Sequence, residues 1–389
     1  MSVGIAAAPQ PLEAKTTPRP GARANAERIL IVNPFGIGDV LFTTPLIRAV
    51  RHAFPASYLG YLCNRRTERI LKNNAHLDAL FIYEKDELVR AWRSSRWQGL
   101  RAFVRLVRRI RRARCDLVID LSLGERYGVL LALLGVRRRI GFNYRGRGRF
   151  LTAWLPIDGY HDEHVVEYYR RLLRFLGIHL LDSSLELEMS DGDRQWARRW
   201  LKQRGIGSGQ LVVGMVPAGG VSWGIDAPFR RWSLEGFAAV GDALVERYGA
   251  RVILFGEATD ASLCQTVARQ MRHPAIDLGG QTTLEQFVSL LGCLGLVICN
   301  DGGPLHLAVS QRVKTVSIFG PVDPCVYGPY PDDEATHRVI RKDELLCRPC
   351  YHQFKLPPCP YERACLMTVQ PDEVLAACAA LLGARPAPA

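Results

Sequence analysis

The chain has 389 residues, of which 48% are hydrophobic, and it carries a formal net charge of +13. This length allows roughly two to three domains of about 150 residues each. The charge says nothing about the fold, but it favours anionic partners such as nucleic acid, phosphorylated sugars or an acidic membrane surface. The longest apolar run, residues 127–136, is about half of the ~20 residues that span a bilayer, so we predict a core helix there and no transmembrane segment.

Two features of the sequence indicate a cytoplasmic protein. Residues 1–26 are rich in Ala and Pro and lack the basic start and long apolar stretch of a secretory signal, so we predict a disordered tail. The 11 cysteines are odd in number, and most of them lie in apolar segments. This usage is typical of a reducing compartment rather than of a disulfide scaffold.

In chain order, short apolar runs alternate with helical patterns, which predicts βα units and parallel sheets. The predicted strands are residues 28–33, 57–63, 79–84, 115–122, 211–219, 251–256, 296–300 and 315–320. The predicted helices are residues 39–54, 99–114, 164–178, 234–249, 283–295, 303–312 and 371–383. The fold class is therefore α/β.

The order of these elements predicts two Rossmann-like domains. A helix that ends at Gly177 is followed by a polar connection, residues 179–193, which we take as the domain boundary. The domains are placed at residues 27–185 (N-terminal) and 186–370 (C-terminal), followed by a final helical segment at 371–389. Ligands of such sheets lie beyond the carboxyl ends of the strands.

The stretch 29–48, ILIVNPFGIGDVLFTTPLIR, joins a predicted strand to a helix through two glycines and Asp39. A dinucleotide-binding loop would need a third glycine, and a carboxylate at the helix start would repel a pyrophosphate. Both points disfavour an NAD-dependent oxidoreductase. Asp39 is either a helix cap, since Asp is favoured there, or a general base that the helix dipole keeps ionised.

Residues 299–324, CNDGGPLHLAVSQRVKTVSIFGPVDP, form a predicted strand, Gly-Gly turn, helix and strand. The turn at Gly302 and Gly303 brings backbone N–H groups to a helix N-terminus, which suits a diphosphate. Asp301 opens the turn, and His306 is near the helix start, where it could contact a phosphate. The alternatives are a turn-forming aspartate and a buried core histidine.

A third stretch, residues 216–237, leads from a predicted strand into a loop with Gly219 and Gly220 and then to Arg230 and Arg231. Arginine can bind phosphate oxygens through two parallel hydrogen bonds, so a basic pair beside a glycine loop suits a phosphate site. The alternative is a solvated pair of arginines.

Together these stretches resemble glycosyltransferase family 9, the ADP-heptose:lipopolysaccharide heptosyltransferases, over residues 28–383. The features that carry the resemblance are ILIVNPFGIGDVLFTTPLIRAVR, HVVEYYRRLLRFLGI, FRRWSLEGF, NDGGPLHLAVSQRVKTVSIFGPVDP and the ending CRPCY…CLMTVQPDEVLAA. The resemblance implies a GT-B fold, in which two Rossmann-like domains with parallel sheets face a central cleft. It also implies that the final helix packs back on the N-terminal domain.

The same resemblance implies an inverting transfer of heptose from ADP-heptose to a lipopolysaccharide core or related saccharide, with no cofactor required for catalysis. Asp39 then falls on the general base, and Arg230 and Arg231 with the turn 301–306 fall on the groups that stabilise the ADP leaving group. The implied nucleotide-sugar site comprises Gly219, Gly220, Arg230, Arg231, Asp301, Gly302, Gly303 and His306, with Glu257 or Asp260 at the nucleoside. The acceptor is expected at Gly38, Thr43 and Arg145.

Alternatives to this function remain open in the sequence. A transferase of the same fold could use another nucleotide sugar or a protein acceptor. A nucleic-acid-binding protein is suggested only by the charge, and no reader motif with interleaved aromatic residues stands out.

The predicted helix 99–114 is strongly basic, with Leu100, Phe103, Val107 and other apolar residues at helical spacing on one face. Such a helix either packs on the sheet with a charged solvent face or lies at an acidic membrane surface. The basic N-terminal domain suits an anionic saccharide or glycolipid acceptor and contact with the inner face of the inner membrane.

Four cysteines lie close together near the end of the chain: Cys347, Cys350, Cys359 and Cys365. Their spacing is compatible with a structural zinc or iron site. The alternative is a set of free thiols in a Pro-rich loop.

Overall fold

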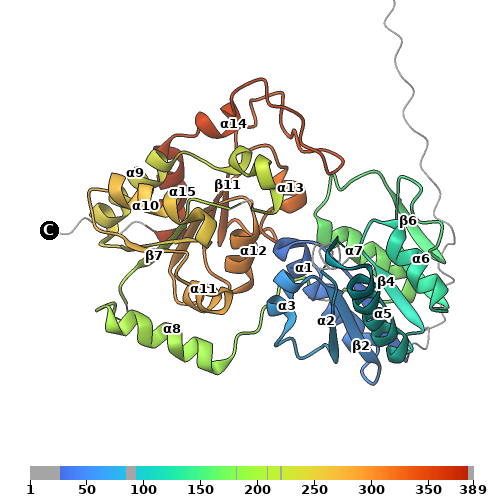
Figure 1. Ribbon diagram of the computed structural model, residues 1–389. Coiled ribbons are helices and arrows are strands. Elements are labelled where there is room, and N and C mark those ends of the chain that lie inside the picture. The colour runs from blue at the N-terminus through green and yellow to red at the C-terminus, as the bar shows by residue number, and fades with distance from the viewer. Residues whose placement is uncertain (1–26, 85–92, 181, 208, 220, 384–389) are drawn as a thin grey trace, which may run out of the picture.

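The computed structural model describes residues 27–84, 93–180, 182–207, 209–219 and 221–383. The predicted tail at 1–26, the predicted phosphate-loop residue Gly220 and the last residues of the predicted final segment lie outside this set. Within the described residues the chain forms two six-stranded sheets, each covered by helices (Figure 1). Every strand pair is parallel, so the predicted α/β class and parallel sheets are confirmed.

The N-terminal sheet has the strand order β3-β2-β1-β4-β5-β6. Its strands are β1 (Arg28–Val32), β2 (Tyr58–Cys63), β3 (Ala79–Ile82), β4 (Leu117–Asp120), β5 (Arg138–Tyr144) and β6 (Ala153–Ile157). Its helices are α1 (Ile37–Leu41), α2 (Thr44–Ala53), α3 (Arg65–Leu71), α5 (Arg96–Ala113), α6 (Glu125–Leu133) and α7 (Val165–Leu173). The central strands β1 and β4 are buried almost throughout, as the unbroken apolar runs in the sequence require.

The C-terminal sheet has the same topology, with the strand order β12-β11-β10-β7-β8-β9. Its strands are β7 (Val212–Val216), β8 (Arg251–Gly256), β9 (Ile276–Gly279), β10 (Leu296–Asn300), β11 (Thr315–Ile318) and β12 (His337–Ile340). Its helices are α8 (Asp191–Gln203), α9 (Leu234–Tyr248), α10 (Ala261–Gln270), α11 (Leu284–Leu291), α12 (Gly303–Ser310), α13 (Pro324–Tyr327), α14 (Ala364–Met367) and α15 (Pro371–Leu382). The domain boundary at 185/186 remains a prediction, and it lies between α7 and α8.

Two local predictions are corrected by the structure. The predicted helix 39–54 is two helices, α1 and α2, which are separated at Phe42 and Thr43, just before Pro45 in the first turn of α2. The final helix α15 packs against α9 and β12 and not on the N-terminal half (Figure 1). Its apolar residues Val374 and Cys378 belong to the core of the C-terminal sheet, and burial there satisfies its apolar face.

The two halves of the chain touch at several places around the cavity, and two of these contacts bear on the site. Helix α1 lies against α12, and Gly38 of α1 is in close contact with α12. The segment 347–365 leaves the C-terminal half and reaches the N-terminal half, where the Gln353 carbonyl accepts a hydrogen bond from the Tyr144 hydroxyl at 3.2 Å. The Gln353 side chain accepts a second one from Arg145 at 3.1 Å.

Candidate active site

A cavity of about 1100 Å³ lies between the two sheets and is lined by both halves of the chain. The loops after β1, β4, β7 and β10 meet there, at the carboxyl ends of the strands, as expected for a ligand site. The predicted site residues that line it are Gly38, Asp39, Gly219, Arg230, Glu257, Asp260, Asp301, Gly302, Gly303 and His306. Thr43, Arg145 and Arg231 are not among its lining residues.

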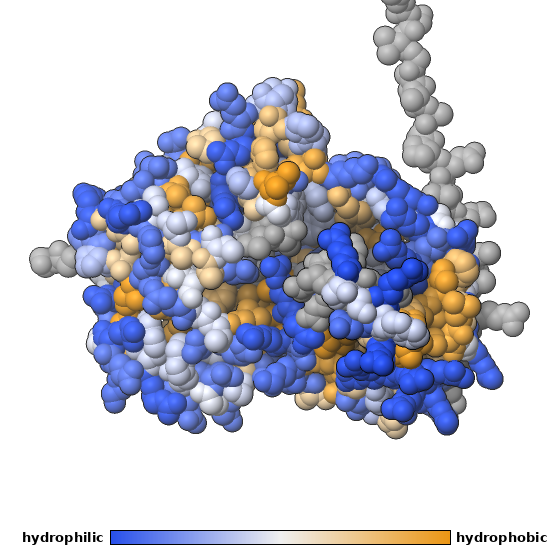
Figure 2. All heavy atoms as spheres, viewed as in Figure 1, coloured by the Kyte–Doolittle hydropathy of each residue, from blue (hydrophilic) through white to orange (hydrophobic). Residues whose placement is uncertain are grey.

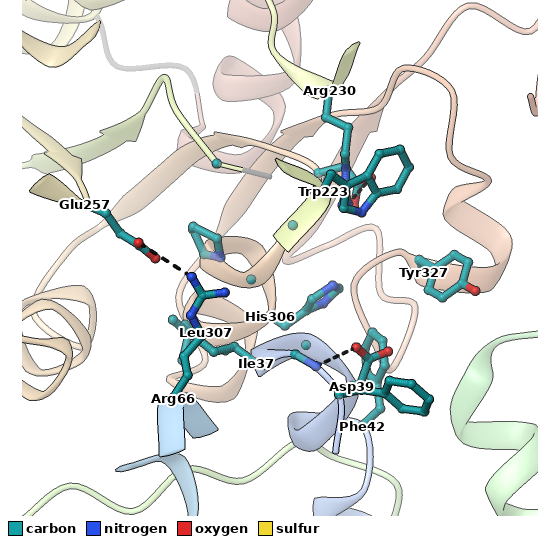
Figure 3. Close-up of a pocket in the computed structure, with 18 of the residues that line it drawn as sticks. Ile37, Asp39, Phe42, Arg66, Trp223, Arg230, Glu257, His306, Leu307 and Tyr327 are labelled. Atoms are coloured by element: carbon teal, nitrogen blue, oxygen red, sulfur yellow. Dashed lines mark hydrogen bonds and ion pairs between the residues drawn. The ribbon is translucent and has the colours of Figure 1, made fainter. Parts of the chain in front are cut away.

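Asp39 is the third residue of α1, and its carboxylate has two roles. Oδ2 accepts a hydrogen bond from the Gly36 N–H at 3.1 Å, so Asp39 does satisfy a backbone donor at the helix start, although the N-cap residue is Gly36. The same carboxylate faces the cavity (Figure 3). Burial raises the pKa of Asp39, while the Gly36 N–H and the Arg230 guanidinium lower it. An ionised carboxylate whose pKa is raised is a stronger proton acceptor than a solvated one.

Helix α12 begins at a glycine turn on the opposite side of the cavity. Gly302 has a φ of 149°, a conformation that L side chains rarely adopt. His306 is buried one turn further on, and a Cβ added to Gly38 would lie only 2.8 Å from its Cδ2. Burial lowers the pKa of His306 to about 3, so the ring is neutral, and its Nδ1 lacks a hydrogen-bond partner among the described residues. A helix N-terminus with an unpaired buried nitrogen beside it is suited to bind a phosphate.

Arg230 and Asp301 form a buried ion pair at the cavity wall. Arg230 also lies over the Trp223 ring, with its guanidinium carbon 4.3 Å from the ring centroid. The Trp223 ring in turn contacts Tyr351 in a tilted arrangement, with the ring centroids 4.7 Å apart. Burial raises the pKa of Asp301, and Arg230 lowers it. The Arg230 Nε makes no hydrogen bond within the described residues, so this guanidinium keeps a donor for an anionic ligand.

Arg231, which was predicted beside Arg230 at the phosphates, has a structural position instead. Its Nε donates to the Gly219 carbonyl at 3.1 Å, and one Nη donates to Asp260 at 3.0 Å. Arg231 therefore connects the loop after β7 to Asp260. Because Asp260 is occupied by that pair, Glu257 is the acidic group that remains open to the cavity; its nearest cation is Arg66, at 3.9 Å across the cavity (Figure 3).

Asn300, the last residue of β10, was not identified from the sequence. Its side-chain nitrogen donates to the carbonyls of Pro217 and Ala218 at 3.0 and 3.1 Å, and its oxygen accepts from the Trp232 N–H at 2.9 Å. This buried amide joins the strand end to the loop after β7. A polar residue between an apolar strand and the Asp-Gly-Gly turn is the only sequence signal that could have indicated it.

Two residues predicted at the acceptor lie elsewhere. The Thr43 hydroxyl is fully buried and hydrogen-bonds to the Val40 carbonyl at 2.7 Å and to the Tyr61 hydroxyl at 2.8 Å. Arg145 points to Gln353. The N-terminal lining near Asp39 is instead rich in aromatic and basic side chains: Phe42, Arg65, Arg66, Arg69, Tyr144, Arg147, Tyr160 and Tyr169.

The four C-terminal cysteines line one small cavity of about 180 Å³ in the C-terminal half. The Cys350 thiol donates to the Cys347 carbonyl at 2.8 Å, and burial raises the pKa of Cys350 to about 11. In the described part of the chain, no group of three or more His, Cys, Asp or Glu side chains is arranged to hold a metal ion. The cysteines are free thiols, and the zinc or iron site indicated by their spacing stays a prediction.

Two facing Rossmann-like domains with a cleft between them form the GT-B fold, which is the fold of one class of glycosyltransferases. Residues 103–356 match glycosyltransferase family 9 (heptosyltransferase), and the chain belongs to this family. No helix in the described ranges is long and apolar enough to cross a bilayer.

Individual relatives agree with this assignment. The chain is 25% identical over 300 residues to lipopolysaccharide heptosyltransferase 3 of Escherichia coli, which covers 75% of this chain and 83% of that protein. The glycosyl transferase family 9 structure from Veillonella parvula DSM 2008 superposes with a TM-score of 0.76 at 25% identity, over 92% of this chain and 97% of that one. The fold is also that of the E. coli heptosyltransferase WaaC, solved with ADP-2-deoxy-2-fluoro heptose (TM-score 0.61, 19% identity, 81% of this chain and 93% of that one).

Proposed function

We propose that the protein transfers heptose from ADP-heptose, with inversion, to a saccharide acceptor of the lipopolysaccharide core or a related glycolipid. The observation that carries this proposal is the placement of Asp39 opposite the turn 301–306 and Arg230 in one cavity. The family of the chain and the ADP-2-deoxy-2-fluoro heptose bound in the WaaC structure support the choice of donor.

In this proposal the C-terminal half binds the nucleotide sugar. The N-terminus of α12, the neutral His306 and the free donor of Arg230 receive the diphosphate. Glu257, whose carboxylate is open to the cavity, accepts hydrogen bonds from the nucleoside ribose. Transfer leaves a negative charge on ADP, and fixed donors that are already in place stabilise that charge.

Asp39 is the proposed general base. It removes the proton from the attacking hydroxyl as the bond between the sugar and the diphosphate breaks, and positioned bases of this kind contribute typically ~10²–10⁴-fold to the rate. Attack from the side of Asp39, opposite the leaving group, gives inversion at the anomeric carbon. The N-terminal half, with its aromatic and basic lining, holds the acceptor at the inner face of the inner membrane.

A donor screen tests the nucleotide part of this proposal. ADP-, UDP-, GDP- and CMP-sugars are compared for the rise in melting temperature that they cause, because a ligand that binds only the native state must raise it. ADP-heptose should give the largest rise. If another nucleotide sugar gives an equal or larger rise in melting temperature, ADP-heptose is not supported as the donor.

The Asp39→Asn variant tests the catalytic part. It keeps the size and an oxygen acceptor for the Gly36 N–H, so the fold should be retained. Transfer should fall by at least ~10²-fold, whereas the affinity for ADP measured by calorimetry should stay within about twofold. Near-normal turnover would mean that Asp39 acts only at the helix start.

A further inference from the structure

Helix α5 packs on the N-terminal sheet with only part of its apolar surface. Leu106, Ile110 and Ala113 contact the core beneath it. Trp97, by contrast, is 73% exposed, and Leu100 and Phe103 are also exposed. These three residues follow one another at intervals of three, so they form an outward-facing apolar stripe along the first half of the helix.

A basic stripe lies beside this apolar stripe. Arg101, Arg105, Arg108 and Arg112 are spaced by three or four residues and are exposed. Within the described part of the chain, none of them makes a hydrogen bond or an ion pair. The seven arginines of α5 are not balanced by any acidic residue of the helix.

The neighbouring helix α6 extends the surface. The sequence predicted a core helix over 127–136, but Leu133 is 81% exposed, because only one side of α6 faces the core. Helices α5 and α6 pack on the same face of the sheet. Figure 2 shows an apolar patch over α6 next to strongly hydrophilic side chains over α5. Residues 96–149 contain fifteen arginines and three acidic residues, which accounts for almost all of the net charge of +13.

We propose that this surface, named here the α5 face and defined by Trp97, Leu100, Phe103, the basic stripe and Leu133, docks on a bilayer that contains anionic phospholipids. Apolar side chains at the interface insert between headgroups while a basic stripe is attracted to anionic lipid. Tryptophan is enriched at the interface between the membrane and water. Duplex nucleic acid would engage the arginines, but it would leave Leu100, Phe103 and Leu133 without a partner.

Docking in this way brings the active-site cavity toward the bilayer. Helix α5 ends just before β4 begins, so its first residue, near Trp97, lies toward the carboxyl-end edge of the sheet. The cavity opens at that same edge. A glycolipid acceptor could then reach Asp39 without leaving the membrane. This inference goes beyond the transfer reaction, and its test contains neither donor nor acceptor.

The test is co-sedimentation of the full chain with vesicles of phosphatidylcholine alone or of phosphatidylcholine mixed with phosphatidylglycerol. The wild type should sediment only with the mixed vesicles, and raised salt should weaken this binding. A triple variant, Arg101→Glu, Arg105→Glu and Arg108→Glu, should lower the partition coefficient at least ~10-fold. A second variant, Trp97→Ser with Phe103→Ser, should lower it while all the arginines are retained.

The matched control places the same charge change on α8, in the C-terminal half: Arg198→Glu, Arg199→Glu and Lys202→Glu, all exposed. It should bind the mixed vesicles like the wild type, and circular dichroism should show that all variants are folded. An equal loss in the control would show that net charge alone drives binding and would overturn the proposal. If the wild type sediments with neither kind of vesicle, whether or not it binds a DNA duplex, the proposal is overturned as well.

Discussion

Replacing Arg230 with Met should destabilise the protein strongly, because it removes the partner of a buried carboxylate. Arg230 is 8% and Asp301 2% exposed, and the two side chains form an ion pair. Removing one partner of a buried pair costs about 3–5 kcal/mol, since the other charge stays buried without compensation. Met keeps the aliphatic packing on Trp223, so the loss of stability reports the missing positive charge rather than a change in side-chain volume.

The pH dependence of this loss follows from the pKa of Asp301, which burial raises and Arg230 lowers. Without the arginine, the pKa of Asp301 in the folded state rises further above its usual value, so the native state of the variant binds a proton more tightly than the unfolded state. Protonation then favours folding. The destabilisation should therefore be largest at neutral pH and should shrink as the pH falls.

Urea unfolding followed by circular dichroism measures both effects. The double variant Arg230→Met with Asp301→Asn should recover much of the lost free energy of unfolding, because no charge remains buried. Calorimetric titration with ADP should show weaker binding for the single variant. If the free energy of unfolding of Arg230→Met at neutral pH lies within about 0.5 kcal/mol of the wild-type value, the buried pair does not contribute the stability assigned to it.

Three further outcomes are expected. Gly38→Ala should lower transfer more than ADP affinity, because the new Cβ would lie 2.8 Å from His306 and push α1, with Asp39, away from α12; unchanged turnover would show that this contact is easily relieved. Burial raises the pKa of Asp120 to about 6, so the wild type loses stability as the pH rises from about 4 through that value. Asp120→Asn should therefore raise the free energy of unfolding at neutral pH by about 2–3 kcal/mol, and this gain should vanish at acidic pH. Glu257→Gln should weaken ADP binding, measured by calorimetry, while the melting temperature stays close to that of the wild type.

The fold could be predicted because parallel strands buried on both faces leave unbroken apolar runs, such as residues 29–32 and 296–299, between helical patterns. The positions of Asp39, Asp301 and His306 followed from the same logic, since Asp301 comes directly after β10 and the other two lie in the first turn of the helix that follows a strand. The division of the helix at Phe42 was missed because buried apolar residues, such as Val40, Leu41, Leu46 and Ile47, continue through it.

Other residues could not be placed from local sequence. Arg230 and Arg231 are adjacent, and only the tertiary structure decides that one meets Asp301 and the other Asp260. The same holds for Arg145, which contacts a loop more than two hundred residues away. The C-terminal cysteines share a cavity, but their spacing does not specify whether the thiols converge on a single point.

The segment 347–365 starts and ends in the C-terminal half but contacts the N-terminal half at Tyr144 and Arg145. It also supplies Tyr351 and Phe354 to the cavity wall. Any hinge motion that separates the two domains must therefore break these hydrogen bonds or carry the segment along. Opening of the cavity between the two domains would therefore act on a segment that also forms part of the cavity wall.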